Sequence, residues 1–85
     1  MATEEEFVNA SERVQKLAKK PSNDELLELY GLYKQATSGD ASGKRPGMLD
    51  VRGRAKYDAW AKQSGTSAEA ARAAYVKVVA RLEGK

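Results

Sequence analysis

Apolar residues recur at helical spacing along four segments of the chain, with polar residues between them. In the first segment Phe7, Ala10, Val14 and Leu17 follow the i, i+3, i+7, i+10 spacing that puts side chains on one helix face. The periodicity returns in three later segments, and no segment alternates apolar and polar residues as a half-buried strand does. The pattern therefore predicts an all-α protein with helices at about residues 4–19, 23–38, 51–63 and 67–83.

Signals for helix starts support the same four segments. In a capping box, a Ser or Thr hydroxyl and the Glu carboxylate three residues later satisfy the free N–H groups of the first turn. A fourth start is expected at Asp50, because this residue type caps helices and follows the helix-breaking pair Pro46-Gly47. The capping boxes are predicted at Thr3-x-x-Glu6, Ser22-x-x-Glu25 and Thr66-x-x-Glu69.

A long loop is predicted between the second and third helices. Residues 38–49 have the sequence SGDASGKRPGML, in which three glycines and a proline disfavour regular structure. The links before Ser22 and after Gly65 are short, so the helices that they join should be close neighbours. The long loop would let the second and third helices run in the same direction, or cross over the bundle. Periodicity alone does not choose between these connections.

Composition restricts the chemistry available to the chain. Its 85 residues suffice for one small domain, and they include no cysteine and no histidine. Disulfides and thiolate metal sites are therefore excluded, and the most common general base is absent. No cluster of hard ligands predicts a metal site, and no motif predicts a catalytic centre, so we expect neither an enzyme nor a bound cofactor.

The expected location is the cytoplasm. The N-terminal MATEEEFVNA is acidic and has no apolar run, so it does not resemble a signal or transit peptide. No stretch approaches the roughly 20 apolar residues that span a bilayer. A small secreted domain without disulfides would be unusual. We therefore expect a cytoplasmic monomer without stable membrane insertion.

Positive charge is concentrated in the third quarter of the chain. The net charge is only +3, but six cations face two aspartates between Lys44 and Lys62. Arg52 and Lys56 share a helix face, and no acidic residue lies three or four positions from either of them. An anionic partner is favoured, and several kinds would suit this charge.

The second predicted helix offers aromatic rings to such a partner. Tyr30 and Tyr33 are three residues apart on one face, and Lys34 follows directly. One interpretation is core packing with the hydroxyls at the rim. The other is a binding face, where cations bind a phosphate and rings stack on a planar base.

The apolar arc of this helix is wider than one core stripe. It includes Leu26 and Leu27 as well as the residues on the tyrosine side. A central helix between two partners would explain most of the arc. Part of it would alternatively line an apolar groove for an amphiphile that has an anionic head and an apolar tail.

Four runs of sequence and two later residues resemble a known family. The runs YGLYKQAT (30–37), GD (39–40), RPGMLD (45–50) and KYDAW (56–60), followed by Gly65 and Tyr75, are similar to those of acyl-CoA-binding proteins. The resemblance extends from Phe7 to Leu82. It implies one acyl-CoA-binding domain over residues 1–85, folded as a four-helix bundle with up-down-down-up topology.

The resemblance also implies a function and a set of site residues. It implies a non-catalytic intracellular carrier of medium- and long-chain fatty acyl-CoA esters. By resemblance, Tyr33 lies against the adenine, Lys34 and Lys56 bind near the 3′-phosphate, and an apolar groove receives the acyl chain. The remaining candidates are Tyr30, Tyr75 and Arg52 for the head group, and Leu26 and Leu27 for the acyl chain.

The chain departs from the family pattern at three positions. Gln15 stands where a lysine is common, and we include it among the candidate site residues. Tyr57 stands where tryptophan is frequent, and Arg52 replaces a frequent lysine. These changes concern affinity and chain-length preference rather than the class of ligand.

Two other functions are consistent with a small basic helical protein. A helical module for acidic peptides or membrane surfaces would bind anionic vesicles without any dependence on coenzyme A. The basic residues lie in the third helix and its loop rather than along one long amphipathic helix, which disfavours surface binding. Nucleic-acid binding would depend steeply on salt, and a net charge of +3 supports it weakly, so no nucleic acid is expected.

Overall fold

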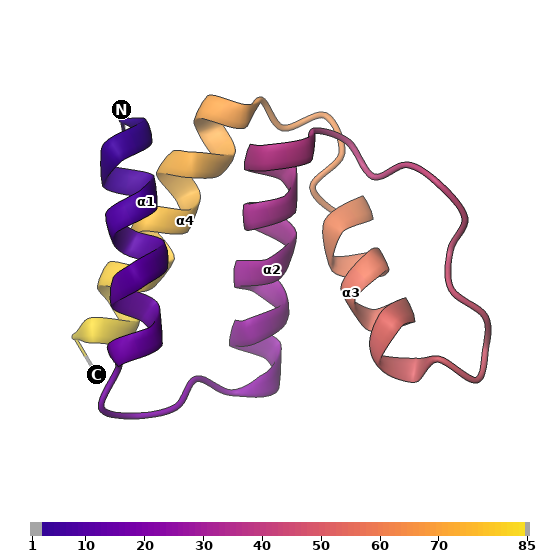
Figure 1. The fold of residues 1–85 in the computed structure, drawn as a ribbon, viewed down its shortest axis with the longest axis horizontal. Coiled ribbons are helices and arrows are strands. Elements are labelled where there is room, and N and C mark those ends of the chain that lie inside the picture. The colour runs from indigo at the N-terminus through magenta and orange to yellow at the C-terminus, as the bar shows by residue number, and fades with distance from the viewer. Residues whose placement is uncertain (1–2, 85) are drawn as a thin grey trace.

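The computed structural model describes residues 3–84, and these residues form a bundle of four α-helices without strands. Figure 1 shows that α2 and α3 run in the same direction and that α1 and α4 run opposite to them. The all-α fold and the up-down-down-up arrangement are therefore confirmed. The helices are α1 (Glu4–Arg13), α2 (Asn23–Ser38), α3 (Val51–Ala61) and α4 (Ala68–Glu83), with a 3₁₀ turn η1 (Val14–Lys16) after α1.

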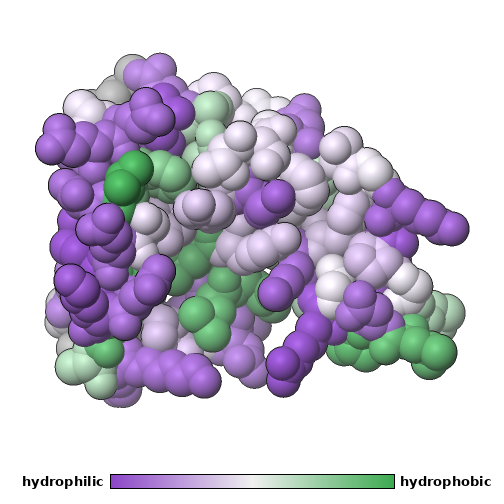
Figure 2. Space-filling model, in the orientation of Figure 1, coloured by the Kyte–Doolittle hydropathy of each residue, from purple (hydrophilic) through white to green (hydrophobic). Residues whose placement is uncertain are grey.

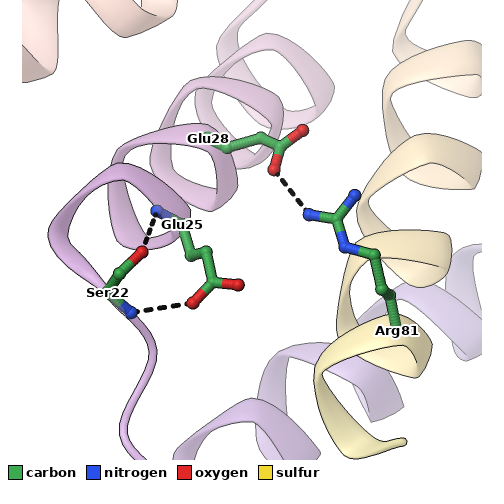
Figure 3. A network of polar contacts seen from close by, with 4 residues as sticks. All are labelled: Ser22, Glu25, Glu28 and Arg81. Atoms are coloured by element: carbon green, nitrogen blue, oxygen red, sulfur yellow. Dashed lines mark hydrogen bonds and ion pairs between the residues drawn. The ribbon is translucent and has the colours of Figure 1, made fainter. Parts of the chain in front are cut away.

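Three of the four helix starts agree with the sequence signals. The Thr3 hydroxyl accepts the Glu6 N–H at 3.1 Å, and the carboxylate of Glu6 completes the capping box. Ser22 and Glu25 form the same arrangement at the start of α2 (Figure 3). The Asp50 carboxylate accepts the Gly53 N–H at 2.9 Å and caps α3.

The predicted capping box at the start of α4 is wrong by one residue. Ser67, and not Thr66, is the cap, and its hydroxyl accepts the Ala70 N–H at 3.1 Å. Thr66 still belongs to the preceding turn, because its N–H is bonded to the Gln63 carbonyl and its carbonyl accepts from Gln35. These two bonds hold Thr66 in the turn, and α4 therefore starts one residue later.

Two predicted helix ends are also too long. The first helix was expected to reach residue 19, but the chain passes into a 3₁₀ turn at Val14 and is extended at Leu17. Leu17 packs against the core from this extended backbone, and Pro21 further disfavours helix at the residue before it. The third helix ends at Ala61 and is followed by turns up to Gly65, where φ is 89°.

The core lies between α1, α2 and α4. It is formed by Phe7 and Ala10 of α1, Leu29 and Leu32 of α2, and Tyr75, Val78, Val79 and Leu82 of α4. Residues 51–61 of α3 include no buried side chain, so this helix packs on the outside of α2. An ion pair of 3.0 Å between Arg81 and Glu28 joins α4 to α2 on the surface (Figure 3).

Helices α2 and α3 can pack closely because position 31 has no side chain. A Cβ built on Gly31 would lie 2.8 Å from the carbonyl carbon of Ala59, and closer still to its oxygen. Real Cβ atoms essentially never come so near to another atom. Gly31 therefore sets the distance at which α3 lies against α2.

A buried amide of α2 binds both the start of the long loop and the link between α3 and α4. Gln35 is buried, and its amide donates to the Asp40 carboxylate at 2.7 Å and to the Thr66 carbonyl at 2.8 Å. Asp40 also accepts the Gly65 N–H at 2.9 Å. The Gly65 N–H, followed by the Gln35 amide, holds the pKa of the Asp40 carboxyl below its ordinary value.

Side chains of α3 hold the same loop from the other side. Arg45 donates two hydrogen bonds to Asp58, at 2.8 and 2.6 Å. The Tyr57 hydroxyl donates to the Gly43 carbonyl at 3.2 Å, and the Trp60 indole N–H donates to the Gly39 carbonyl at 2.6 Å. The loop is therefore anchored along its length, although it has no regular structure. None of the helices within residues 3–84 is long and apolar enough to cross a membrane.

Candidate functional site

A groove of about 340 Å³ opens where η1, α2 and α4 meet. Figure 2 shows apolar atoms in the hollowed face between α1 and α2. Five residues proposed from sequence line the groove together: Gln15, Leu26, Tyr30, Tyr33 and Tyr75. The other lining residues are Val14, Pro21 and Leu29.

Two tyrosines that line the groove, Tyr33 and Tyr75, form an aromatic cluster with Phe7. The Phe7 ring stacks on Tyr33 with centroids 5.6 Å apart, and Tyr75 meets the edge of Phe7 at 5.1 Å. Only 4% of Tyr75 is exposed, whereas 42% of Tyr33 is exposed. Burial raises the pKa of the Tyr75 hydroxyl above its ordinary value, and the nearby Tyr33 adds to this effect. Tyr33 thus presents an open ring on an apolar support, which is suited to stacking with a planar group.

Two lysines connect the tyrosine side of α2 to α3. The Lys56 ammonium lies 5.5 Å from the centre of the Tyr30 ring, and the Lys34 ammonium lies 4.8 Å from the Trp60 ring. Both distances allow a cation–π interaction. Each helix contributes one ring and one cation to these two contacts. Because α2 and α3 run in the same direction (Figure 1), the earlier residue of one helix meets the earlier residue of the other, and the later residue meets the later.

The charge of these lysines is not neutralised by neighbours. Within residues 3–84, neither lysine forms an ion pair with a carboxylate, and the same holds for Arg52. Arg52 lies exposed one turn before Lys56 on the same face of α3. The rim beside Tyr30 therefore has three cations available to an anionic ligand.

One candidate lies elsewhere. Leu27 lines a separate hollow between α2 and α3, together with Asp24, Glu28, Asp58 and Lys62. Successive residues of a helix are turned by about 100°, so Leu26 and Leu27 face different sides of α2. The structure therefore brings Leu26 to the tyrosine groove and leaves Leu27 apart from it.

Sequence reasoning missed two contributors to this site. Phe7 was expected only as part of a core stripe, yet its ring supports Tyr33. Trp60 was expected only as an apolar residue of the third helix, yet it underlies Lys34. The spacing held a signal, because Tyr30 and Lys34 are four apart on one helix and Lys56 and Trp60 are four apart on the next. When two such pairs lie on parallel helices, the cation of each helix can lie over the ring of the other.

Comparison with known proteins gives similarity along nearly the whole chain. The sequence model of the family described as Acyl CoA binding protein matches residues 4–79. An acyl-CoA-binding protein homolog of Drosophila melanogaster is 49% identical over 81 residues, which cover 95% of this chain and 94% of that protein. The acyl-CoA-binding protein of Dictyostelium discoideum is 49% identical over 79 residues, which cover 93% of this chain and 94% of that protein.

Solved structures extend the similarity to the fold. The crystal structure of Oryza sativa Acyl-CoA-Binding Protein 2 matches with a TM-score of 0.88 and 44% identity, over 92% of this chain and 85% of that chain. The crystal structure of ACBP from Moniliophthora perniciosa matches with a TM-score of 0.89 and 42% identity, over 95% of this chain and 80% of that chain. Sequence and fold therefore agree over the same residues.

Proposed function

The chain belongs to the acyl-CoA-binding protein family, and from this premise we propose that it is a non-catalytic carrier of medium- and long-chain fatty acyl-CoA esters. In this proposal the ester binds as one molecule to a monomeric, cytoplasmic protein, and residues 1–85 act as a single binding domain. The ligand leaves chemically unchanged, so the site needs no acid, base or nucleophile.

The observation that supports the proposal most directly is the position of Tyr30. Its ring lines the apolar groove and also lies 5.5 Å from the Lys56 ammonium. An apolar tail and an anionic head group could therefore bind on either side of one residue. Acyl thioesters of a phosphorylated nucleotide combine these two parts, and they add a planar base that suits the exposed ring of Tyr33.

The head group is assigned to the cationic rim. Lys34 and Lys56 would bind the 3′-phosphate, and each charge-assisted hydrogen bond would contribute about 1.5–3 kcal/mol. The exposed ring of Tyr33 would stack on the adenine, supported from below by Phe7. Arg52 would add positive charge beside these groups, and the buried Tyr75 would form the bottom of the groove next to Tyr33.

The acyl chain is assigned to the groove. Leu26, Leu29 and Val14 offer apolar surface there. Gln15 lines the same groove and is neutral, so it would contribute hydrogen bonds and not charge. Leu27 is left out of the acyl site, because it lines the hollow on the other side of α2.

The experiment that tests this assignment uses two ligands that differ by one phosphate. Lys34→Met and Lys56→Met remove the ammonium but keep an apolar stem over Trp60 and Tyr30. Each variant should bind palmitoyl-CoA roughly tenfold to a hundredfold more weakly, which corresponds to one lost charge-assisted contact. With palmitoyl-3′-dephospho-CoA, the same variants should differ little from the unchanged protein.

A matched control is available at the residue that follows α3. Lys62 is exposed and lines the separate hollow, so Lys62→Met should leave both affinities unchanged. Equal losses with both esters would mean that the lysines act through the fold and not on the phosphate. No loss in either variant would contradict the head-group assignment.

A further inference from the structure

Three large apolar side chains project into solvent where the long loop meets α3. Met48 is 82% exposed, Leu49 is 101% exposed and Val51 is 72% exposed. We call these three residues the apolar tip. Figure 2 shows apolar atoms gathered at the lower right corner, where Figure 1 places the end of the loop and the start of α3. Single exposed apolar residues are ordinary, but three within four positions on one projection indicate an interaction surface.

The fold holds the apolar tip in a fixed shape. The Asp50 N–H donates to the Gly47 carbonyl at 3.0 Å, which closes a turn around Met48 and Leu49. The Asp50 carboxylate then caps α3 through Gly53, so the turn leads directly into the helix. Just before the turn, the two bonds from Arg45 to Asp58 anchor the loop. The apolar side chains are therefore presented without being needed by the core, and their burial would require little ordering of the backbone.

Positive charge surrounds the apolar tip. Between residues 44 and 58 the chain has five cations and two carboxylates. Both carboxylates are engaged, because Asp58 accepts from Arg45 and Asp50 caps α3. With both carboxylates counted, this segment keeps a net charge of +3, and neither Lys44 nor Arg52 forms an ion pair with a carboxylate of the described residues. Apolar side chains among cations are suited to the boundary between anionic head groups and acyl chains.

We propose that the apolar tip inserts reversibly into the head-group layer of a bilayer that contains anionic phospholipid. The convex form of the tip favours this partner, because a peptide would be bound by a groove or a sheet edge on this chain. This surface is distinct from the groove that is assigned to the acyl chain and does not depend on it. The basic residues do not lie along one long amphipathic helix, but the apolar tip forms a projecting corner (Figure 1) that can enter a membrane without any helix lying on the surface.

The test measures co-sedimentation with vesicles in the absence of any acyl-CoA. Vesicles of phosphatidylcholine with phosphatidylserine should bind the protein, and vesicles of phosphatidylcholine alone should bind it far less. Leu49→Ser should weaken binding to the anionic vesicles roughly tenfold to a hundredfold, since it removes one large buried apolar side chain. Lys44→Gln should weaken it roughly fivefold and should reduce its dependence on salt.

The matched control is Val8→Ser, because Val8 is an exposed apolar residue on α1. It should bind vesicles like the unchanged protein. Equal vesicle binding by the unchanged protein and Leu49→Ser would overturn the proposal. So would a loss of self-association in Leu49→Ser without any vesicle binding, because the tip would then contact a second copy of the chain.

A parallel titration separates this inference from the proposed carrier function. Leu49→Ser should bind palmitoyl-CoA with unchanged affinity, since Leu49 does not line the groove. A protein that bound anionic vesicles through the tip but bound no acyl-CoA would contradict the carrier function alone. A protein that bound acyl-CoA but no anionic vesicles would contradict the membrane contact alone.

Discussion

Replacing Gly31 by alanine would test the close packing of α2 on α3. In an unconstrained helix this change is favourable by about 1 kcal/mol, because alanine has the higher helix propensity. Here the new methyl carbon would lie 2.8 Å from the Ala59 carbonyl carbon. Carbon atoms pack best at about 3.5–4.0 Å, so α3 would have to move outward by roughly 1 Å. The obstacle is backbone, and it cannot rotate out of the way.

The two effects can be weighed against each other. Overpacking of this kind costs about 1–3 kcal/mol, so the net loss of stability should be about 1 kcal/mol after the gain in propensity. For a domain of this size, that loss lowers Tm by about 4–8 °C. The free energy of acyl-CoA binding should fall by more than the free energy of unfolding, because α3 holds Lys56 over Tyr30 and Trp60 under Lys34. Loss of one charge-assisted contact weakens binding by tenfold or more, at about 1.5 kcal/mol.

Urea unfolding and calorimetric titration with palmitoyl-CoA measure these two quantities separately. Gly47→Ala is the matched control, because a Cβ at Gly47 would meet nothing within 4 Å and its φ is not positive. This control should leave affinity unchanged and stability equal or slightly higher. A Gly31→Ala protein with raised stability and unchanged affinity would refute the account of how α3 is positioned.

Three further predictions follow from other contacts. Ser67→Ala should lower the free energy of unfolding by about 1 kcal/mol, whereas Thr66→Ala should be nearly neutral, and urea unfolding of both variants distinguishes the two candidate caps. The pKa of Asp40 is lowered in the folded state, so its carboxylate stabilises the fold at pH values above its unfolded pKa near 3.8. This stabilisation is lost as the pH falls through the folded pKa, and Asp40→Asn should flatten this part of the profile of unfolding free energy against pH. Affinity for acyl-CoA should rise about fourfold for each methylene that the groove buries, which calorimetry with octanoyl, lauroyl and palmitoyl esters would measure; equal affinities would contradict an acyl chain in the groove.

Local signals predicted most of the fold. The capping boxes at Thr3 and Ser22 form as expected, because each depends only on residues within one helical turn. The start of α4 was misplaced because the choice between Thr66 and Ser67 depends on a hydrogen bond from Gln35, which is 31 positions away in sequence. The end of α1 was misplaced for a similar reason, since the packing of Leu17 against the core overrides its helical spacing.

The candidate site was predictable in part. The spacing of Tyr30 and Tyr33 correctly placed both side chains on one face, where they line the groove together with Tyr75. The structure adds Phe7, whose ring stacks on Tyr33. Leu26 and Leu27 were proposed together from a wide apolar arc, but a wide arc does not say which neighbour covers which part. The pairing of Lys34 with Trp60 depends on the parallel packing of two helices, which periodicity leaves open.

The exposed side chains were the least predictable feature. Met48 and Leu49 lie at the end of the long loop, and their hydrophobicity alone would suggest burial. The structure exposes them because Gly47 and Asp50 close a tight turn on the outside of α3, away from the core of α1, α2 and α4. Exposure of this kind depends on the tertiary arrangement and has no signature in spacing.

The most direct test of the proposed function is calorimetric titration of the delipidated protein with palmitoyl-CoA, free coenzyme A and palmitate. The ester should bind tightly with one molecule per chain, and both fragments should bind far more weakly, because the cationic rim and the groove then act on one ligand. Equally weak binding of all three compounds would contradict the carrier function.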